Sequence, residues 1–173
     1  YCEKNKCIAQ WNNNIFVDII SNTMYHFNSK NIISGDTFIC LPGAEGYVDD
    51  ALKKGAVEIK KMTRAEMAQL ANEVYDAPSK KLTTIGVTGT NGKTTVCHLI
   101  ASVLRQAGHN PYVLGTLNGE LTTPESLDIQ RIMATHLAEG GTHFVMEVSS
   151  IGIDQHRVDC IDFDLKILTN ITQ

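Results

Sequence analysis

Apolar residues in the second half of the chain follow two alternating patterns. Short runs rich in β-branched residues predict strands at residues 83–88, 111–115, 143–148 and 165–168. Between them, apolar residues at helical spacing predict helices at residues 96–107 and 123–139, each followed by glycine. Strands that alternate with helices of this length favour βαβ units, so we predict an α/β fold class with a parallel sheet.

The first half of the chain shows a weaker version of this alternation. Its pattern predicts strands at residues 37–41 and 56–59, a helix at residues 47–54, and a strand or a short helix at residues 15–20. Thr63 and Glu66 have the spacing of a capping box, in which each side chain bonds the other residue's backbone N–H, so a further helix is predicted to follow Thr63.

The pattern breaks at residues 76–81, where Pro78 cannot continue a helix and the neighbours are small or charged. We therefore predict a domain boundary there. Residues 1–81 form a small mixed α/β N-terminal domain, and residues 82–173 form a parallel-sheet domain that we expect to be incomplete at its C-terminal side.

Composition narrows the class of protein. The chain has 173 residues, 43% of them hydrophobic and 20% charged, which is typical of a soluble globular protein. Its net charge of −4 gives no sign of a nucleic-acid partner, and no apolar run is long enough for a membrane span. The five cysteines form no Cys-x-x-Cys pair, and the charged first residues do not resemble an export signal, so we expect a cytoplasmic location. The oligomeric state stays open.

The strongest chemical signal lies where the first strand of the second half meets its helix. The turn is rich in small residues and leads into Gly92-Lys93-Thr94-Thr95, an arrangement that lets backbone N–H groups and a helix N-terminus face phosphate oxygens. Lys93 is predicted to reach the β- and γ-phosphates and Thr94 to ligate Mg²⁺. The strict phosphate-loop motif has glycine where this chain has Val87, and an ordinary strand-to-helix turn is the alternative. The predicted nucleotide-binding residues are Gly89, Thr90, Asn91, Gly92, Lys93, Thr94 and Thr95.

Glu147 is the second signal, because it ends an apolar run that would be buried on both faces. A buried carboxylate needs a cation, and beside a phosphate loop that cation would be Mg²⁺ held together with Thr94. The alternative is a solvated acid on an edge strand. Ser149, which follows, would either bind substrate or cap the next helix.

Further polar residues near these segments have two readings each. Gln155 and Arg157 form a donor-rich cluster, since a guanidinium suits phosphate or carboxylate, although a lone surface arginine is usually just solvated. Thr122 and Thr123 offer hydroxyls to a ligand, but Thr123 also suits a helix cap, with Pro124 at the first helical position.

Three segments together resemble the Mur ligases. They are Gly-Val-Thr-Gly-Thr-Asn-Gly-Lys-Thr-Thr at residues 86–95, Thr-Thr-Pro-Glu at residues 122–125 and Met-Glu-Val-Ser-Ser-Ile-Gly-Ile-Asp-Gln-His-Arg-Val at residues 146–158. The first segment is shared with folylpolyglutamate and cyanophycin synthetases. The other two resemble the branch that adds the third residue of the peptidoglycan peptide, and the resemblance extends upstream to about residue 28.

The resemblance implies an ATP-dependent amide ligase of cell-wall synthesis. ATP would phosphorylate the D-glutamyl carboxylate of UDP-N-acetylmuramoyl-L-alanyl-D-glutamate, and meso-diaminopimelate or L-lysine would attack the acyl phosphate. By position, Lys93 and Glu147 are catalytic, and Thr94 and Glu147 hold Mg²⁺. The residues implied to contact the muramoyl-dipeptide substrate are Ser29 at its uridine end and Thr122, Thr123, Ser149, Gln155 and Arg157.

The sequence also departs from the family pattern. Asn28 and Lys30 replace the Asp and Arg usual around Ser29, and Ile151 stands where many members have histidine. The family's Asp-His motif, its modified lysine and its C-terminal domain would follow residue 173. We therefore expect residues 1–173 not to catalyse the full reaction by themselves.

Two other functions remain open from the sequence. One is a GTPase switch or another P-loop ATPase, although the chain has no Asn-Lys-x-Asp tetrapeptide for guanine. The other is a non-catalytic module that binds the UDP-muramoyl ligand or a nucleotide without turnover.

Overall fold

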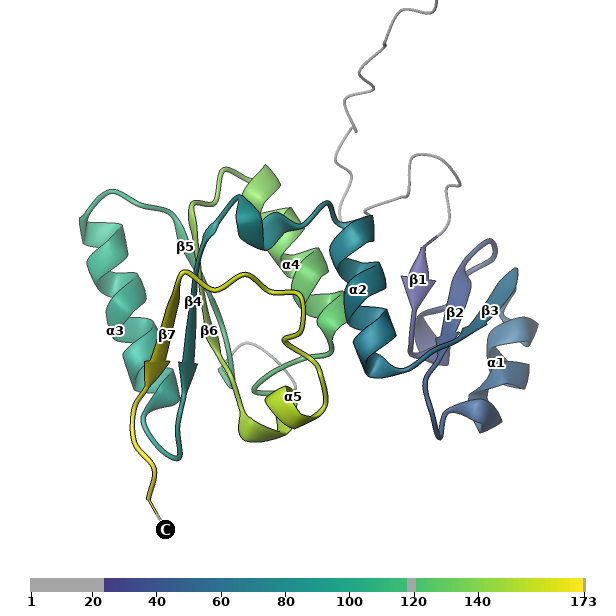
Figure 1. Ribbon diagram of the computed structural model, residues 1–173. Coiled ribbons are helices and arrows are strands. Elements are labelled where there is room, and N and C mark those ends of the chain that lie inside the picture. The colour runs from purple at the N-terminus through teal and green to yellow at the C-terminus, as the bar shows by residue number, and fades with distance from the viewer. Residues whose placement is uncertain (1–23, 118–120, 173) are drawn as a thin grey trace, which may run out of the picture.

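The computed structural model describes residues 24–117 and 121–172. It contains two parallel sheets with helices between them and on their outer faces, arranged from α3 at one end to α1 at the other (Figure 1). The element expected at residues 15–20 lies outside the described residues. Within the described part, no helix is long and apolar enough to cross a bilayer.

The N-terminal sheet has three strands in the order β1-β2-β3, namely Tyr25–His26, Thr37–Cys40 and Glu58–Lys61. Its last strand lies two residues later than the pattern at residues 56–59 predicts. Strand β1 was not predicted, because two residues are too few for an alternating pattern to emerge. The accompanying helices are α1, Val48–Lys53, and α2, Arg64–Val74, with short 3₁₀ turns at Ser29–Asn31, Glu45–Tyr47 and Pro78–Lys80.

Helix α2 begins as its sequence predicts. The Thr63 hydroxyl accepts a hydrogen bond from the Glu66 backbone N–H, and the Glu66 carboxylate accepts one from the Thr63 backbone N–H. This capping box satisfies two N–H groups that would otherwise lack a partner at the helix start.

The second sheet has four parallel strands in the order β5-β6-β4-β7. These strands are Pro111–Leu114, His143–Glu147, Thr83–Thr88 and Leu165–Leu168, in that order. Its helices are α3, Lys93–Gln106, α4, Ser126–Ala138, and the short α5, Ser150–Asp154. Helix α3 covers one face of the sheet and α4 the other (Figure 1).

Helix α4 connects the two units through shared packing. Its residues Ile129 and Met133 are buried against the second sheet, in the same cluster as Phe144. Residues Leu127 and Ala134 of the same helix belong to the core cluster of the N-terminal sheet and α2. Burial of apolar side chains on both sides holds α4 between the two units.

The start of α4 corrects one prediction. The helix begins at Ser126 with Glu125 at its N-cap, so Thr123 is not the cap and Pro124 is not the first helical residue. The Thr123 hydroxyl is used elsewhere, because it donates to the backbone carbonyl of Glu147 at 3.0 Å and accepts the Ser149 N–H at 2.9 Å.

Candidate functional site

The loop between β4 and α3 has the shape needed to hold an anion. Gly92 precedes the helix with φ of +84°, a left-handed conformation that glycine adopts without strain. The Lys93 ammonium group folds back over the loop and donates to the carbonyl oxygens of Gly89 at 2.8 Å and Thr90 at 3.4 Å. The lysine therefore lies on the loop, at the N-terminus of a 14-residue helix.

Glu147 lies at the end of β6, and β6 lies between β5 and β4. The alternative of a solvated acid on an edge strand is therefore wrong, and only 2% of the residue's surface is exposed. Because β4 and β6 are parallel, with Val87 opposite Glu147, the carboxylate and the phosphate loop share the carboxyl edge of the sheet.

The contacts of the Glu147 carboxylate join it to the loop. Its Oε1 accepts hydrogen bonds from the Thr94 hydroxyl at 2.9 Å and from the Thr116 backbone N–H at 3.0 Å. Gly115 makes this approach possible, because a Cβ at that position would overlap the carboxylate. Among the described residues Glu147 forms no ion pair, so a buried negative charge has only neutral donors around it.

This donor set fits Mg²⁺. The Thr94 hydroxyl and the Glu147 carboxylate supply oxygen only, which is the ligand type that magnesium prefers. The described residues contain no group of three or more His, Cys, Asp or Glu side chains able to hold a metal. Magnesium usually keeps several waters and takes one or two protein ligands plus substrate phosphates, so two protein oxygens beside a phosphate loop suffice.

The sequence did not single out Thr116, which extends this network. Its hydroxyl donates to Oε2 of Glu147 at 3.3 Å and lies 3.0 Å from the hydroxyl of Thr122. Thr122 was expected to contact the substrate, and the structure brings it to the same carboxylate through one intervening residue. The only sequence signal at Thr116 was its position directly after a strand.

Ser149 serves as a helix cap. Its hydroxyl accepts the Gly152 N–H at 3.0 Å at the start of α5. The backbone N–H of Ser149 bonds Thr123, whose hydroxyl also donates to the carbonyl of Glu147. Thr123 therefore ties the end of β6 to the segment before α4.

Arg157 lies in a cluster of polar partners. Its guanidinium donates to the Thr123 carbonyl at 2.8 Å and to the Gln155 side-chain oxygen at 2.6 Å. Its Nε lies 3.4 Å from the carboxylate of Glu125, which also accepts from Arg64 of α2 at 3.2 Å. The sequence indicated neither Glu125 nor Arg64, because ion pairs between segments 61 residues apart leave no local pattern.

Ser29 is not part of this assembly. It is buried in the N-terminal unit, where its hydroxyl donates to Asp50 of α1 at 2.7 Å. Lys54 donates to the same carboxylate at 2.9 Å and to the Ser29 carbonyl at 3.2 Å. Helix α1 and the phosphate loop before α3 lie at opposite ends of the molecule in Figure 1.

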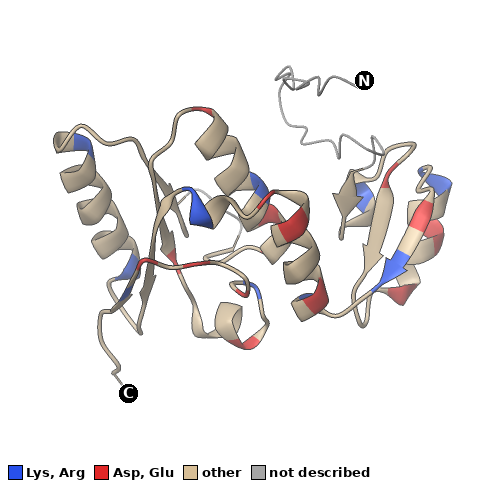
Figure 2. Cartoon of the chain, turned by 45° about the horizontal axis from the view of Figure 1, so that its top comes forward, with Lys and Arg blue, Asp and Glu red and all other residues tan. Residues whose placement is uncertain are grey.

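Basic and acidic residues occur along both units (Figure 2). Cys97, one turn into α3, is buried, and its burial raises its pKa to about 12, with the negative charge of Glu147 adding to the rise. The thiol therefore stays protonated near neutral pH and acts as a packing residue.

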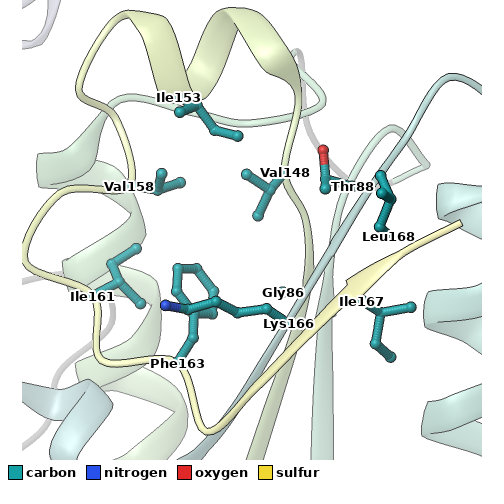
Figure 3. A pocket seen from close by; sticks show the side chains of 10 residues that line it. All are labelled: Gly86, Thr88, Val148, Ile153, Val158, Ile161, Phe163, Lys166, Ile167 and Leu168. Atoms are coloured by element: carbon teal, nitrogen blue, oxygen red, sulfur yellow. The ribbon is translucent and has the colours of Figure 1, made fainter. Parts of the chain in front are cut away.

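An apolar pocket of about 370 Å³ lies beside β4 and β7 (Figure 3). Side chains from α5 and the segment after it, including Ile153, Val158 and Phe163, face the strand residues there. Lys166 is the only charged residue in its lining. Phosphate binding needs several charged or N–H donors. The pocket lining offers one charged side chain, so its chemistry differs from that of the phosphate loop.

The model of one protein family, the Mur ligase middle domain, matches residues 87–173, about half of the chain. The chain belongs to the Mur ligase family. The matched residues include all of residues 89–95, Glu147 with its hydrogen bond to Thr94, and the segment from Thr122 to Arg157.

Curated members of the Mur ligase family cover more of the chain. It is 38% identical over 152 residues to the UDP-N-acetylmuramoyl-L-alanyl-D-glutamate–2,6-diaminopimelate ligase of Caldanaerobacter subterraneus subsp. tengcongensis, covering 73% of this chain and 32% of that protein. It is 38% identical over 181 residues to the ligase of the same name from Clostridioides difficile, covering 88% of this chain and 37% of that protein. The chain thus spans about a third of the length of these relatives.

A solved Mur ligase structure has the same fold. It is described as a UDP-N-acetylmuramoyl-L-alanyl-D-glutamate–2,6-diaminopimelate ligase, with a TM-score of 0.73 and 25% sequence identity. The match covers 87% of this chain and 36% of that one, so it includes both units of the molecule.

Proposed function

We propose that this chain is part of an ATP-dependent ligase that adds 2,6-diaminopimelate to UDP-N-acetylmuramoyl-L-alanyl-D-glutamate. The observation that carries the proposal is the 2.9 Å hydrogen bond between Thr94 and Glu147, extended by Thr116 to Thr122. Residues implied to bind ATP and a residue implied to bind the muramoyl substrate thus meet at one buried carboxylate. The printed names of the relatives support the choice of substrates.

The proposed reaction has two steps. The D-glutamyl carboxylate attacks the γ-phosphorus of ATP, which forms an acyl phosphate and releases ADP. The amine of the incoming amino acid then attacks the acyl carbon, forms the amide bond and releases inorganic phosphate. Phosphoryl transfer of this kind depends mainly on positioning and on neutralising the charge of the phosphates.

The residues of this chain divide the work of the first step. Residues 89–95 form the phosphate loop, in which the backbone N–H groups at the N-terminus of α3 hold the phosphates, and Lys93 leaves the loop carbonyls to bind the β- and γ-phosphates. Thr94 and Glu147 hold Mg²⁺, which neutralises negative charge on the phosphate oxygens when bound.

The muramoyl substrate is proposed to lie against the other half of the site. Thr122, Thr123, Ser149, Gln155 and Arg157 face the dipeptide portion. Arg157 exchanges its contacts with the Thr123 carbonyl and Gln155 for the substrate carboxylate, to which a guanidinium can donate two parallel hydrogen bonds.

We also propose two domains with separate tasks. Residues 1–81 hold the uridine end of the substrate, with Ser29 as one contact, and residues 82–173 hold ATP. Because ATP and UDP-linked precursors are made in the cytoplasm, a cytoplasmic location follows from the proposed substrates.

The test is product formation by a protein that carries this chain. We expect UDP-N-acetylmuramoyl-tripeptide to form from the dipeptide precursor, ATP, Mg²⁺ and 2,6-diaminopimelate, with L-lysine as the competing amino acid. Lys93→Ala should abolish the product, because the variant loses the cation at the phosphates. Equal turnover with Lys93→Ala would show that the phosphate loop takes no part in the reaction. A preference for L-lysine would overturn the assignment of the amino acid.

A further inference from the structure

The segment after β7 lies along the phosphate loop. Backbone and side-chain atoms of Asn170 contact two consecutive loop residues: the Thr90 N–H donates to the Asn170 carbonyl at 3.0 Å, and the Asn91 N–H donates to the Asn170 Oδ1 at 3.1 Å. The Asn170 side-chain Nδ2 in turn donates to the Asn91 carbonyl at 3.1 Å. The Asn170 side chain thus accepts from the backbone N–H of Asn91 and donates to the backbone carbonyl of the same residue.

The neighbours of Asn170 add to this contact. The Thr169 hydroxyl donates to the Asn91 carbonyl at 2.7 Å, and the Thr172 N–H donates to the Thr90 hydroxyl at 3.1 Å. Because β7 pairs with β4, the segment leaves the sheet directly beside the strand that enters the loop. The segment after β7 therefore holds the loop through contacts between residues 79 positions apart in the chain, such as Asn91 and Asn170.

The side chain at position 170 must be an amide for this arrangement. An aspartate keeps the oxygen that accepts the Asn91 N–H but loses the donor to the Asn91 carbonyl. It would also place a negative charge against a loop that holds phosphates.

The remaining loop amides are the ones left for a ligand. Gly92, the N-cap of α3, offers no side-chain cap, and within the described residues no acceptor contacts the backbone N–H groups of Lys93, Thr94 or Thr95. The N–H groups of Thr90 and Asn91 are already bonded to Asn170. The loop therefore has an outer part held by Asn170 and an inner part open at the helix N-terminus.

We propose that Asn170 is a positioning residue of the nucleotide site. It holds the outer part of the loop in the conformation that directs the amides at residues 93–95 toward the phosphates. This inference rests on the proposed function, since it assumes that the loop binds ATP. It adds a residue outside the loop motif whose effect is on nucleotide affinity, through preorganisation of the loop.

The test measures two properties of Asn170→Ala, with Ile171→Ala as the matched control because Ile171 is 81% exposed. The first is hydrogen exchange of the Asn91 amide without nucleotide, which we expect to speed up about tenfold when its acceptor is lost. The second is the Kd for MgATP by calorimetry, which we expect to rise about tenfold. Ile171→Ala should change neither property.

Asn170→Asp separates positioning from general loss of structure. We expect at least the tenfold weakening estimated for the alanine variant, about half of it recovered at high salt because charge repulsion is screened. The loss in Asn170→Ala should not depend on salt. If Asn170→Ala also lowers the thermal unfolding midpoint, the salt dependence of MgATP binding by Asn170→Asp still tests whether residue 170 acts on phosphate binding.

The outcomes distinguish the inference from the proposed function. If the unchanged chain binds MgATP and both Asn170 variants bind it equally well, Asn170 is not a positioning residue and the proposed function stands. If the unchanged chain binds no MgATP, the proposed function fails at its ATP step and the inference fails with it. Weaker affinity together with faster exchange at Asn91 supports the inference.

Discussion

Replacing Glu147 with glutamine removes one negative charge while leaving the hydrogen-bond network nearly intact. The new side-chain oxygen can take the place of Oε1 and accept from the Thr94 hydroxyl and the Thr116 N–H. The new amide can take the place of Oε2 and donate to the Thr116 hydroxyl, which is able to accept and which can still donate to Thr122. We therefore expect the free energy of unfolding to change by less than about 1 kcal/mol.

The effect on ligand binding should be much larger. A hydrogen bond or ligand contact that involves a charged group contributes about 2–3 kcal/mol, so MgATP should bind about 30- to 150-fold more weakly to Glu147→Gln. Without Mg²⁺ this weakening should disappear, because the buried carboxylate repels the phosphates and the glutamine does not. The variant should then bind ATP as well as the unchanged chain or better.

The assay is calorimetric titration of ATP with excess Mg²⁺ and again with EDTA. Glu139→Gln is the matched control, since Glu139 is exposed at the end of α4 and the same substitution there should change neither titration. If Glu147→Gln keeps the full advantage of Mg²⁺ over EDTA, Glu147 does not hold the metal. If the variant unfolds, the argument from hydrogen-bond replacement is wrong.

Three further predictions concern Gly115, Glu125 and His26. Gly115→Ala places a Cβ against the Glu147 carboxylate and should lower the free energy of unfolding, measured by denaturant titration, by about 1–3 kcal/mol. An unchanged value would contradict the close approach of the carboxylate to residue 115. Glu125→Gln weakens the ion pair to Arg157 and should lower the thermal unfolding midpoint by several degrees, whereas an unchanged midpoint shows that the pair adds no stability. Burial lowers the pKa of His26 below 6.5, so below about pH 6.5 the unfolded chain binds more protons and the free energy of unfolding should fall as the pH drops toward the folded pKa. In denaturant titrations at several pH values, His26→Gln should make the free energy of unfolding depend less on pH, and an equal dependence refutes the assignment.

The sequence allowed the central pair of the site to be predicted because parallel strands impose strong geometry. Thr94 follows one strand and Glu147 ends another, and carboxyl ends of neighbouring parallel strands meet at one edge of the sheet. The order of strands was not predictable, since no local pattern reports it. That order decides that Glu147 is buried in the interior of the sheet.

The rest of the site depends on contacts that sequence patterns do not contain. Thr123 has the residue type of a helix cap, yet its hydroxyl bonds Glu147 and Ser149 because the chain turns toward β6 before α4 begins. Thr116 and Asn170 lie in loops, where no periodicity constrains their neighbours. Their roles depend on segments 31 and 79 residues away in the chain.

In the proposed function, this site activates the D-glutamyl carboxylate by phosphorylation. The most direct measurement labels that carboxylate of UDP-N-acetylmuramoyl-L-alanyl-D-glutamate with heavy oxygen and follows the label during turnover by a protein that carries this chain. We predict that one labelled oxygen appears in the released inorganic phosphate, because the acyl phosphate breaks between carbon and that oxygen. Release of unlabelled phosphate together with formation of the amide would show that no acyl phosphate forms.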